Sequence, residues 1–140
     1  MKRIAQLMIL GSLVAMMAVS GHAATAKQKI CLQAEGEWAA WINSMPGPGK
    51  AGLGTLIVTG KVTAPTAGFR AILRAGRMDP KKTRVRSVEL VVVPPKGMNG
   101  QVMTEIDVRL DARETVKLEG VQVMCGGKAI KWISPVEIVN

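Results

Sequence analysis

The feature that most constrains the fold is an alternation of apolar and polar residues on both sides of a short, turn-rich segment. Apolar side chains recur at every second position from 88 to 92 and again from 106 to 110, and residues 94–100 between them are rich in Pro, Gly and Asn. A period of two is typical of a strand with one buried face. The sequence therefore predicts an antiparallel hairpin over residues 87–110, whose buried face must be covered by other strands.

Similar short runs occur along the rest of the chain and are separated by turn residues. They predict strands near residues 29–34, 38–43, 54–62, 69–74, 121–125, 128–133 and 136–138. Gly36 separates the first two runs, residues 111–114 are expected to form a polar turn, and Gly126-Gly127 is a strong two-residue hairpin signal. We therefore expect an all-β fold: an antiparallel two-sheet immunoglobulin-like sandwich of about eight strands, with a small β-barrel as the alternative.

The start of the chain has the pattern of a secretory signal peptide. Lys2 and Arg3 precede a mostly apolar run over residues 4–19, and Gly21 and Ala23 provide the small residues of a cleavage site. The apolar run is shorter than the roughly 20 residues that a membrane-spanning helix needs. We expect residues 1–24 to be a signal and residues 25–140 to be one exported domain that does not span a membrane, in a bacterial periplasm or outside the cell.

The composition of the exported part limits its chemistry. Lys2 and Arg3 account for two of the 19 basic residues against 10 acidic ones, so without the signal the formal charge is +7 rather than +9. The only histidine, His22, lies beside the signal cleavage site, and the chain has no tyrosine. Histidine-assisted nucleophiles and histidine-ligated metals are therefore excluded from the mature chain. We expect no cofactor, no metal and no catalysis, and an enzyme built on carboxylates or lysines is the least favoured alternative.

Two cysteines, Cys31 and Cys125, lie near the two ends of the predicted domain. In an exported protein such a pair is typical of a structural disulfide. A redox site would usually carry Cys-x-x-Cys, and a copper site would cluster its Cys, Met or His ligands. We therefore predict a Cys31–Cys125 disulfide.

The segment of residues 64–69, Ala-Pro-Thr-Ala-Gly-Phe, is expected to form a tight turn between two strands. It resembles the Asn-Pro-Thr-Thr-Gly-Tyr/Phe loop of chagasin-type cysteine-protease inhibitors, which are small immunoglobulin-like sandwiches, and it is similar to Pro-Thr-x-Gly-aromatic turns of other small secreted bacterial immunoglobulin-like domains. The resemblance implies an inhibitory wedge made by Pro65, Thr66 and Gly68. The second loop of that family, Gly-x-Gly-Gly, matches more loosely the residues Gly97, Met98, Asn99 and Gly100. Its third loop has no counterpart here.

Positive charge is concentrated in one short stretch. Residues 70–86 contain one acid and seven basic residues, namely Arg70, Arg74, Arg77, Lys81, Lys82, Arg84 and Arg86. Such a cluster predicts a basic face that docks an anionic envelope component or an acidic protein partner. The alternative is protection of an edge strand against aggregation. We do not expect nucleic acid, because Phe69 is the only aromatic residue nearby and it shares the parity of the core.

These features favour three classes of function. The first is a non-catalytic exported binding or accessory protein that acts through the basic face. The second is a secreted protease inhibitor of immunoglobulin-like fold, and the third is an enzyme using carboxylate or lysine chemistry. The identity of the ligand, the strand order and the oligomeric state do not follow from the sequence.

Overall fold

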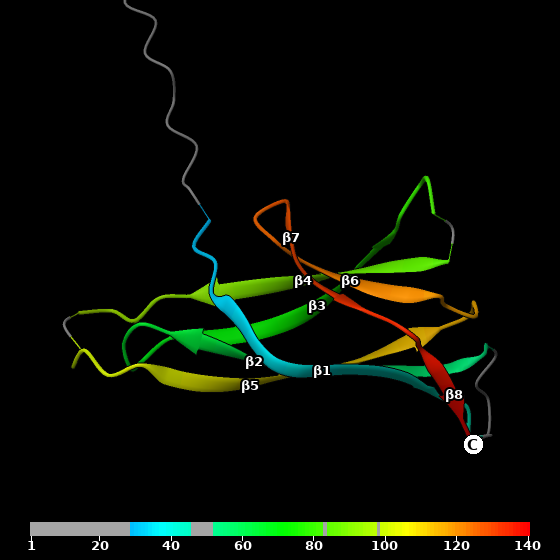
Figure 1. Ribbon diagram of the computed structural model, residues 1–140, viewed down its shortest axis with the longest axis horizontal. Coiled ribbons are helices and arrows are strands. Elements are labelled where there is room, and N and C mark those ends of the chain that lie inside the picture. Colours follow the sequence, from blue (N-terminus) through cyan, green and yellow to red (C-terminus); the bar gives the residue numbers. More distant parts are fainter. Residues whose placement is uncertain (1–28, 46–51, 83, 98) are drawn as a thin grey trace, which may run out of the picture.

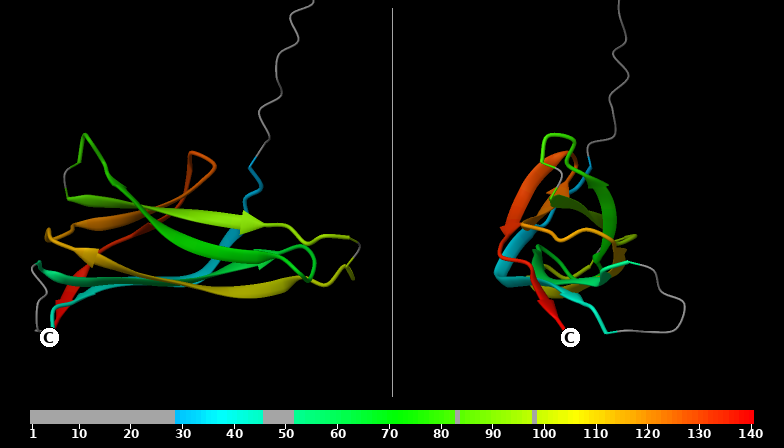
Figure 2. Two further views of the ribbon diagram at one scale, coloured as in Figure 1. Left: turned by 180° about the vertical axis from the view of Figure 1, so that it is seen from behind. Right: turned by 90° about the vertical axis from the view of Figure 1, so that its right-hand side faces the viewer.

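The computed structural model describes residues 29–45, 52–82, 84–97 and 99–140, and this part of the chain contains eight β-strands and no helix (Figure 1). The strands are β1 Gln33–Asn43, β2 Gly54–Ala64, β3 Arg70–Met78, β4 Val85–Val93, β5 Thr104–Glu114, β6 Gly120–Cys125, β7 Lys128–Ile133 and β8 Glu137–Val139. They form two four-stranded sheets, sheet A with the order β5-β2-β1-β8 and sheet B with the order β3-β4-β6-β7. The two layers are visible lengthwise and end-on in Figure 2. The all-β, two-sheet sandwich is confirmed, and the sheets do not close into a barrel. The predicted signal, residues 1–24, lies outside the described residues.

The core lies between the sheets and uses one face of each. Ile42 of β1, Val58 of β2, Val88 of β4 and Val123 of β6 are all fully buried. Each such side chain stabilises the fold by about 1.5–3 kcal/mol when it leaves water. Each belongs to an alternating series of apolar residues in its own strand, and alternate side chains of a strand point to opposite faces of the sheet.

Two glycines in the sheets make room for tryptophan rings. A Cβ atom on Gly60 would lie 2.0 Å from Cδ2 of Trp38, whose indole is buried in the core. A Cβ atom on Gly120 would lie 2.3 Å from Cη2 of Trp132, whose ring is half-exposed. In both places the absent side chain, rather than backbone freedom, explains the glycine.

The hairpin predicted over residues 87–110 is wrong in its pairing, although both strands exist. β4 pairs with β3 and β6 in sheet B, whereas β5 pairs with β2 in sheet A. The connection between them, residues 94–103, includes Pro94 and Pro95 and carries the chain from one sheet to the other. A two-residue turn forces its flanking strands together, but a connection of this length does not.

The two strands predicted at residues 29–34 and 38–43 are one strand, β1. Its register with β2 shifts between Glu35 and Ala39, and Gly36 within that interval has a φ of 62°. Glycine adopts this left-handed conformation without a steric penalty, so the strand bulges instead of ending.

Strand direction also differs from the antiparallel arrangement that we expected. Four of the six pairings are antiparallel, but β1 and β8 run parallel, and so do β4 and β6. The β4–β6 pair is parallel because the strand between them in sequence, β5, belongs to the opposite sheet. The predicted Gly126-Gly127 hairpin joins β6 and β7, and both glycines have positive φ angles, 60° and 83°.

The predicted disulfide between Cys31 and Cys125 is present, with a Cα–Cα separation of 5.8 Å. Cys31 precedes β1 of sheet A, and Cys125 ends β6 of sheet B. The bond therefore ties the segment that enters one sheet to a strand of the other. A closed loop of this length contributes about 4–5 kcal/mol in the chain-entropy model.

Candidate functional site

The structure divides the seven residues of the predicted basic face into exposed charges and paired charges. Five are exposed, and none of them forms an ion pair with a described residue; they are Arg70, Arg74, Arg77, Lys81 and Lys82. Arg84 is exposed but pairs with Glu119 at 3.1 Å. Arg86 is turned toward the interior.

Arg86 forms a two-pronged ion pair with Glu114. Its Nε and Nη2 atoms each donate a hydrogen bond of 2.8 Å to a different carboxylate oxygen. The Arg86 side chain is 19% exposed, and that of Glu114 is fully buried. Because β4 and β5 lie in different sheets, this pair links sheet A to sheet B. Arg86 therefore supports the sandwich and does not belong to the exposed basic surface.

Glu114 is satisfied by more than its arginine. Its Oε1 atom also accepts hydrogen bonds from the backbone N–H groups of Thr115 and Val116, at 3.0 and 3.2 Å. Burial raises the pKa of the Glu114 carboxyl. The hydrogen bonds and charge of Arg86, together with the two backbone donors, lower the pKa by more than burial raises it, so the pKa lies below its usual value. The polar turn predicted at residues 111–114 is wrong, because β5 continues to Glu114.

The positions of these two charged residues in their strands could have indicated the ion pair from the sequence. Glu114 has the same parity as the buried residues Val108 and Leu110, and Arg86 has the same parity as the buried Val88 and Leu90. Two opposite charges on the buried parity of two strands indicate an internal ion pair, since a buried charge needs a partner.

The exposed basic residues of β3 lie beside aliphatic ones. Arg70, Ile72 and Arg74 alternate with the core residue Leu73, so all three project from the solvent face of sheet B. Directly opposite on β4, Val93 pairs with Arg70, Val91 pairs with Ile72 and the acidic Glu89 pairs with Arg74. The exposed fraction is 48% for Ile72 and 42% for Val93. We call this set the arginine–aliphatic face: Arg70, Ile72, Arg74, Val91 and Val93.

A shallow depression of about 270 Å³ adjoins this face. The charged residues Lys29, Arg74 and Glu89 line it, together with apolar residues that include Ile30 and Val91. Lys29 contacts Glu89 at 3.2 Å, and both side chains are largely open to water. Exposed ion pairs of this kind are worth at most about 1 kcal/mol, so an anion can compete for the lysine.

The remaining exposed charges lie around the turn between β3 and β4, which projects from the body of the sandwich (Figure 1). Arg77 lies within an irregularity in the β3–β4 register between Ala75 and Met78. At the turn, Asp79 accepts hydrogen bonds from the backbone N–H groups of Lys81 and Lys82, at 2.8 and 3.2 Å. The two lysine side chains are exposed there.

The two inhibitor-like segments lie against each other. A Cβ atom on Gly68, which has a φ of 88°, would lie 2.9 Å from Cβ of Pro95 and 3.0 Å from Nδ2 of Asn99. The β2–β3 turn, with Pro65 and Thr66, therefore packs on the β4–β5 connection. That connection also includes Gly97 and Gly100, while Met98 lies outside the described residues. Its last two residues, Val102 and Met103, are both strongly exposed.

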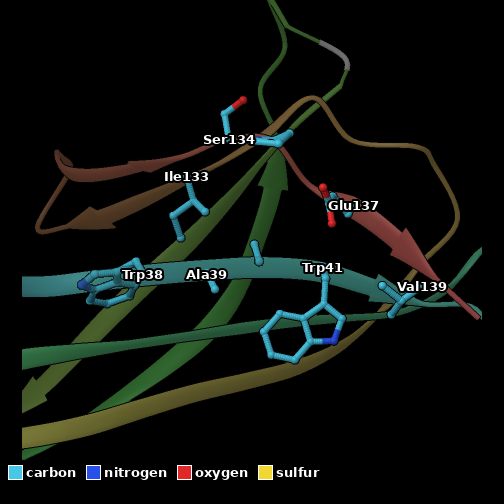
Figure 3. Close-up of a pocket in the computed structure, with 9 residues that line it drawn as sticks. Trp38, Ala39, Trp41, Ile133, Ser134, Glu137 and Val139 are labelled. Carbon is cyan, nitrogen blue, oxygen red and sulfur yellow. The ribbon is translucent and has the colours of Figure 1, made fainter.

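A groove of about 510 Å³ opens between β1 and the segment that joins β7 to β8. In Figure 3, Trp38 and Ile133 lie at one end of the groove, and Trp41, Glu137 and Val139 lie at the other. The walls are mostly apolar, and Glu137 is the only charged residue among the described residues that line it. Within the described structure, the Nε1 atom of Trp38 is buried and has no hydrogen-bond partner. The sequence pattern did not indicate this groove, because it forms where β7 leaves sheet B and β8 joins sheet A.

No three His, Cys, Asp or Glu side chains of the described residues gather closely enough to hold a metal ion. In the same part of the chain, no helix is long and apolar enough to cross a membrane. Comparison of the chain with models of protein families, with curated proteins and with solved structures finds no match.

Proposed function

We propose that this chain is a non-catalytic exported protein that binds an anionic envelope component, or an acidic partner, through its exposed basic residues. The observation that carries this proposal is the difference between paired and unpaired charges. Arg86 is paired with the buried Glu114 and Arg84 pairs with Glu119 at the surface, whereas the five other basic residues of the stretch form no ion pair with a described residue. Unpaired charges of one sign that are concentrated on one strand and the turn after it attract an oppositely charged partner over long range.

Protection of the edge strand explains only part of this pattern. β3 is an edge strand of sheet B, and charged residues on such strands discourage pairing with other chains. However, the register irregularity after Ala75 already interrupts this edge. Three of the unpaired charges, Arg70, Arg74 and Arg77, lie on this strand, and the turn beyond it adds Lys81 and Lys82, which protection of the strand does not explain. The Cys31–Cys125 disulfide is compatible with an exported, oxidising location.

The proposal is tested by measuring binding to three anionic probes: phosphatidylglycerol vesicles, lipopolysaccharide and polyglutamate. We expect the protein to bind at least one probe at about 50 mM salt and to bind it much more weakly at about 500 mM, where the Debye length falls to a few ångströms. The variant Arg70→Glu/Arg74→Glu/Arg77→Glu should lose this binding.

A matched control reverses three charges elsewhere on the surface, at Lys61, Lys117 and Lys128, all of which are exposed. It changes the net charge by the same amount and should retain most of the binding. Failure to bind any probe, or equal losses in the two triple variants, would contradict the proposal.

Inhibition of a papain-like protease is a second candidate function. The observation that favours it is the contact of Gly68 with Pro95 and Asn99, since an inhibitory wedge requires its loops to lie together at one end of the domain. Titration of papain with the purified protein checks this candidate. Full protease activity at a large molar excess of the protein would remove it.

A further inference from the structure

We propose that the anionic partner is a phospholipid bilayer surface and that the arginine–aliphatic face of sheet B lies against it. This inference rests on the function proposed above and adds the class of partner and the mode of contact. It is carried by the placement of exposed aliphatic side chains between unpaired arginines.

The two arginines of the face are spaced along one strand. Arg70 and Arg74 are four residues apart, which corresponds to about 13 Å at the rise of a β-strand. Both point to the same side of the sheet because their separation is even. A guanidinium group binds a phosphate oxygen pair through two parallel hydrogen bonds, so each arginine can hold a separate lipid headgroup.

The space between the arginines is apolar. Ile72 lies between them on β3, and Val91 and Val93 lie opposite on β4. Ile72 and Val93 keep nearly half of their surface exposed to water. A flexible acidic polymer gains little by covering such side chains, whereas the boundary between headgroups and acyl chains removes them from water.

The depression next to the face offers a seat for one headgroup. Lys29 and Arg74 are among the residues that line it, together with the apolar Ile30 and Val91. Glu89 is the one acid among the described residues that line it; it contacts Lys29 at 3.2 Å and lies directly opposite Arg74 in the β3–β4 register. The local charge of these three residues is therefore positive, and a phosphate group can replace the exposed carboxylate as the partner of the lysine.

The other candidate surfaces lack this combination. The turn that carries Lys81 and Lys82 has charge but no exposed large aliphatic residue among its described residues. The groove beside Trp41 has apolar walls, but its one charge is the carboxylate of Glu137. Of these three surfaces of the described residues, the arginine–aliphatic face brings both properties to one side of a sheet.

The test is co-sedimentation of the full domain with vesicles of phosphatidylglycerol mixed with phosphatidylcholine, compared with vesicles of phosphatidylcholine alone. We expect binding only to the anionic vesicles. The variant Arg70→Gln/Arg74→Gln should bind about 30-fold more weakly, which follows from about 1 kcal/mol for each basic residue near an anionic surface. The variant Ile72→Ser/Val93→Ser should bind about tenfold more weakly and should lose the part of the binding that survives high salt.

The control variant Lys117→Gln/Lys128→Gln removes the same charge from exposed positions outside the face. It should bind within about twofold of the original protein if the contact is local. Circular dichroism and an intact disulfide verify the fold of each variant. Since both double substitutions of the face are on its solvent side, they leave the core unchanged.

Four results would overturn the inference. Binding to polyglutamate without binding to anionic vesicles would identify an acidic protein as the partner and would leave the proposed function standing. An unaltered affinity of Ile72→Ser/Val93→Ser for anionic vesicles would remove the aliphatic contact. Equal losses in the arginine and lysine variants would show attraction by net charge alone. Failure to bind any anionic probe would instead reject the proposed function together with the inference.

Discussion

Replacing Glu114 with Gln tests the internal ion pair that joins the two sheets. Glu114 is the only charged residue of the described chain that is buried. Glutamine keeps the size of the side chain but has one oxygen acceptor instead of two. The guanidinium of Arg86 then loses its counter-charge and at least one of its two 2.8 Å hydrogen bonds.

The expected cost follows from the environment of the arginine. Removing one partner of a buried ion pair typically destabilises a protein by about 3–5 kcal/mol, because the other charge remains without compensation. Arg86 is 19% exposed, so water can reach part of the guanidinium and the lower end of that range applies. We expect Glu114→Gln to lower the free energy of unfolding by about 3 kcal/mol and the melting temperature by about 10 °C.

Urea unfolding followed by tryptophan fluorescence measures this loss, with the disulfide kept intact. The double variant Arg86→Met/Glu114→Leu provides the decisive comparison. It removes both charges, and replacing a whole buried pair by apolar side chains is often neutral or stabilising. It should therefore be more stable than Glu114→Gln by about 2 kcal/mol or more.

Two outcomes would refute this reasoning. One is a Glu114→Gln protein whose free energy of unfolding lies within about 0.5 kcal/mol of the original, a change typical of surface sites. The other is a double variant as unstable as the single one. In that case packing or the backbone hydrogen bonds of the Glu114 carboxylate, and not its charge, would determine the effect.

Two further predictions concern stability. The pKa of Glu114 is lower in the folded state than in the unfolded state, so the stabilisation by its carboxylate is complete above the unfolded pKa of about 4.3 and is lost as the pH falls through the lower folded-state value. The difference in unfolding free energy between the original protein and Glu114→Gln should therefore shrink over that acidic range, which unfolding curves measured at several pH values would show. Gly60→Ala places a methyl group 2.0 Å from the ring of Trp38, so it should lower the free energy of unfolding by about 1–3 kcal/mol and change the fluorescence spectrum. The control Gly100→Ala, whose methyl group meets no atom within 4 Å, should change the free energy of unfolding by less than about 0.5 kcal/mol. Equal stability of the two variants would contradict the packing argument.

Much of the fold was accessible from local sequence patterns. Strands that need only a period of two, the Gly126-Gly127 hairpin and the pairing of Cys31 with Cys125 are all confirmed. The sequence did not predict which strands pair where the connections are long, because a segment such as that between β4 and β5 allows either a hairpin or a change of sheet. Local signals also indicated a boundary at Gly36, because a bulge and a strand end use the same residue.

For the candidate site, the sequence identified the charges but not their partners. It grouped Arg86 with the exposed residues, since basic residues dominate that stretch. Its partner Glu114 lies 28 positions away on another sheet. The exposed aliphatic residues Ile72 and Val93 were assigned to strands, but only the register of β3 with β4 places them together between the arginines.

The pairing of β8 with β1 has a consequence for how the domain assembles. Residues 137–139 complete sheet A by lying along residues 41–43, and the disulfide joins residues 31 and 125. The first strand and the cysteine before it therefore lack their partners until the last part of the chain has folded against them. Contacts between such distant positions form only after a large loop has closed, and the entropy lost in closing the loop slows folding. A chain organised in this way is expected to acquire its structure as one late, concerted event, with both ends present.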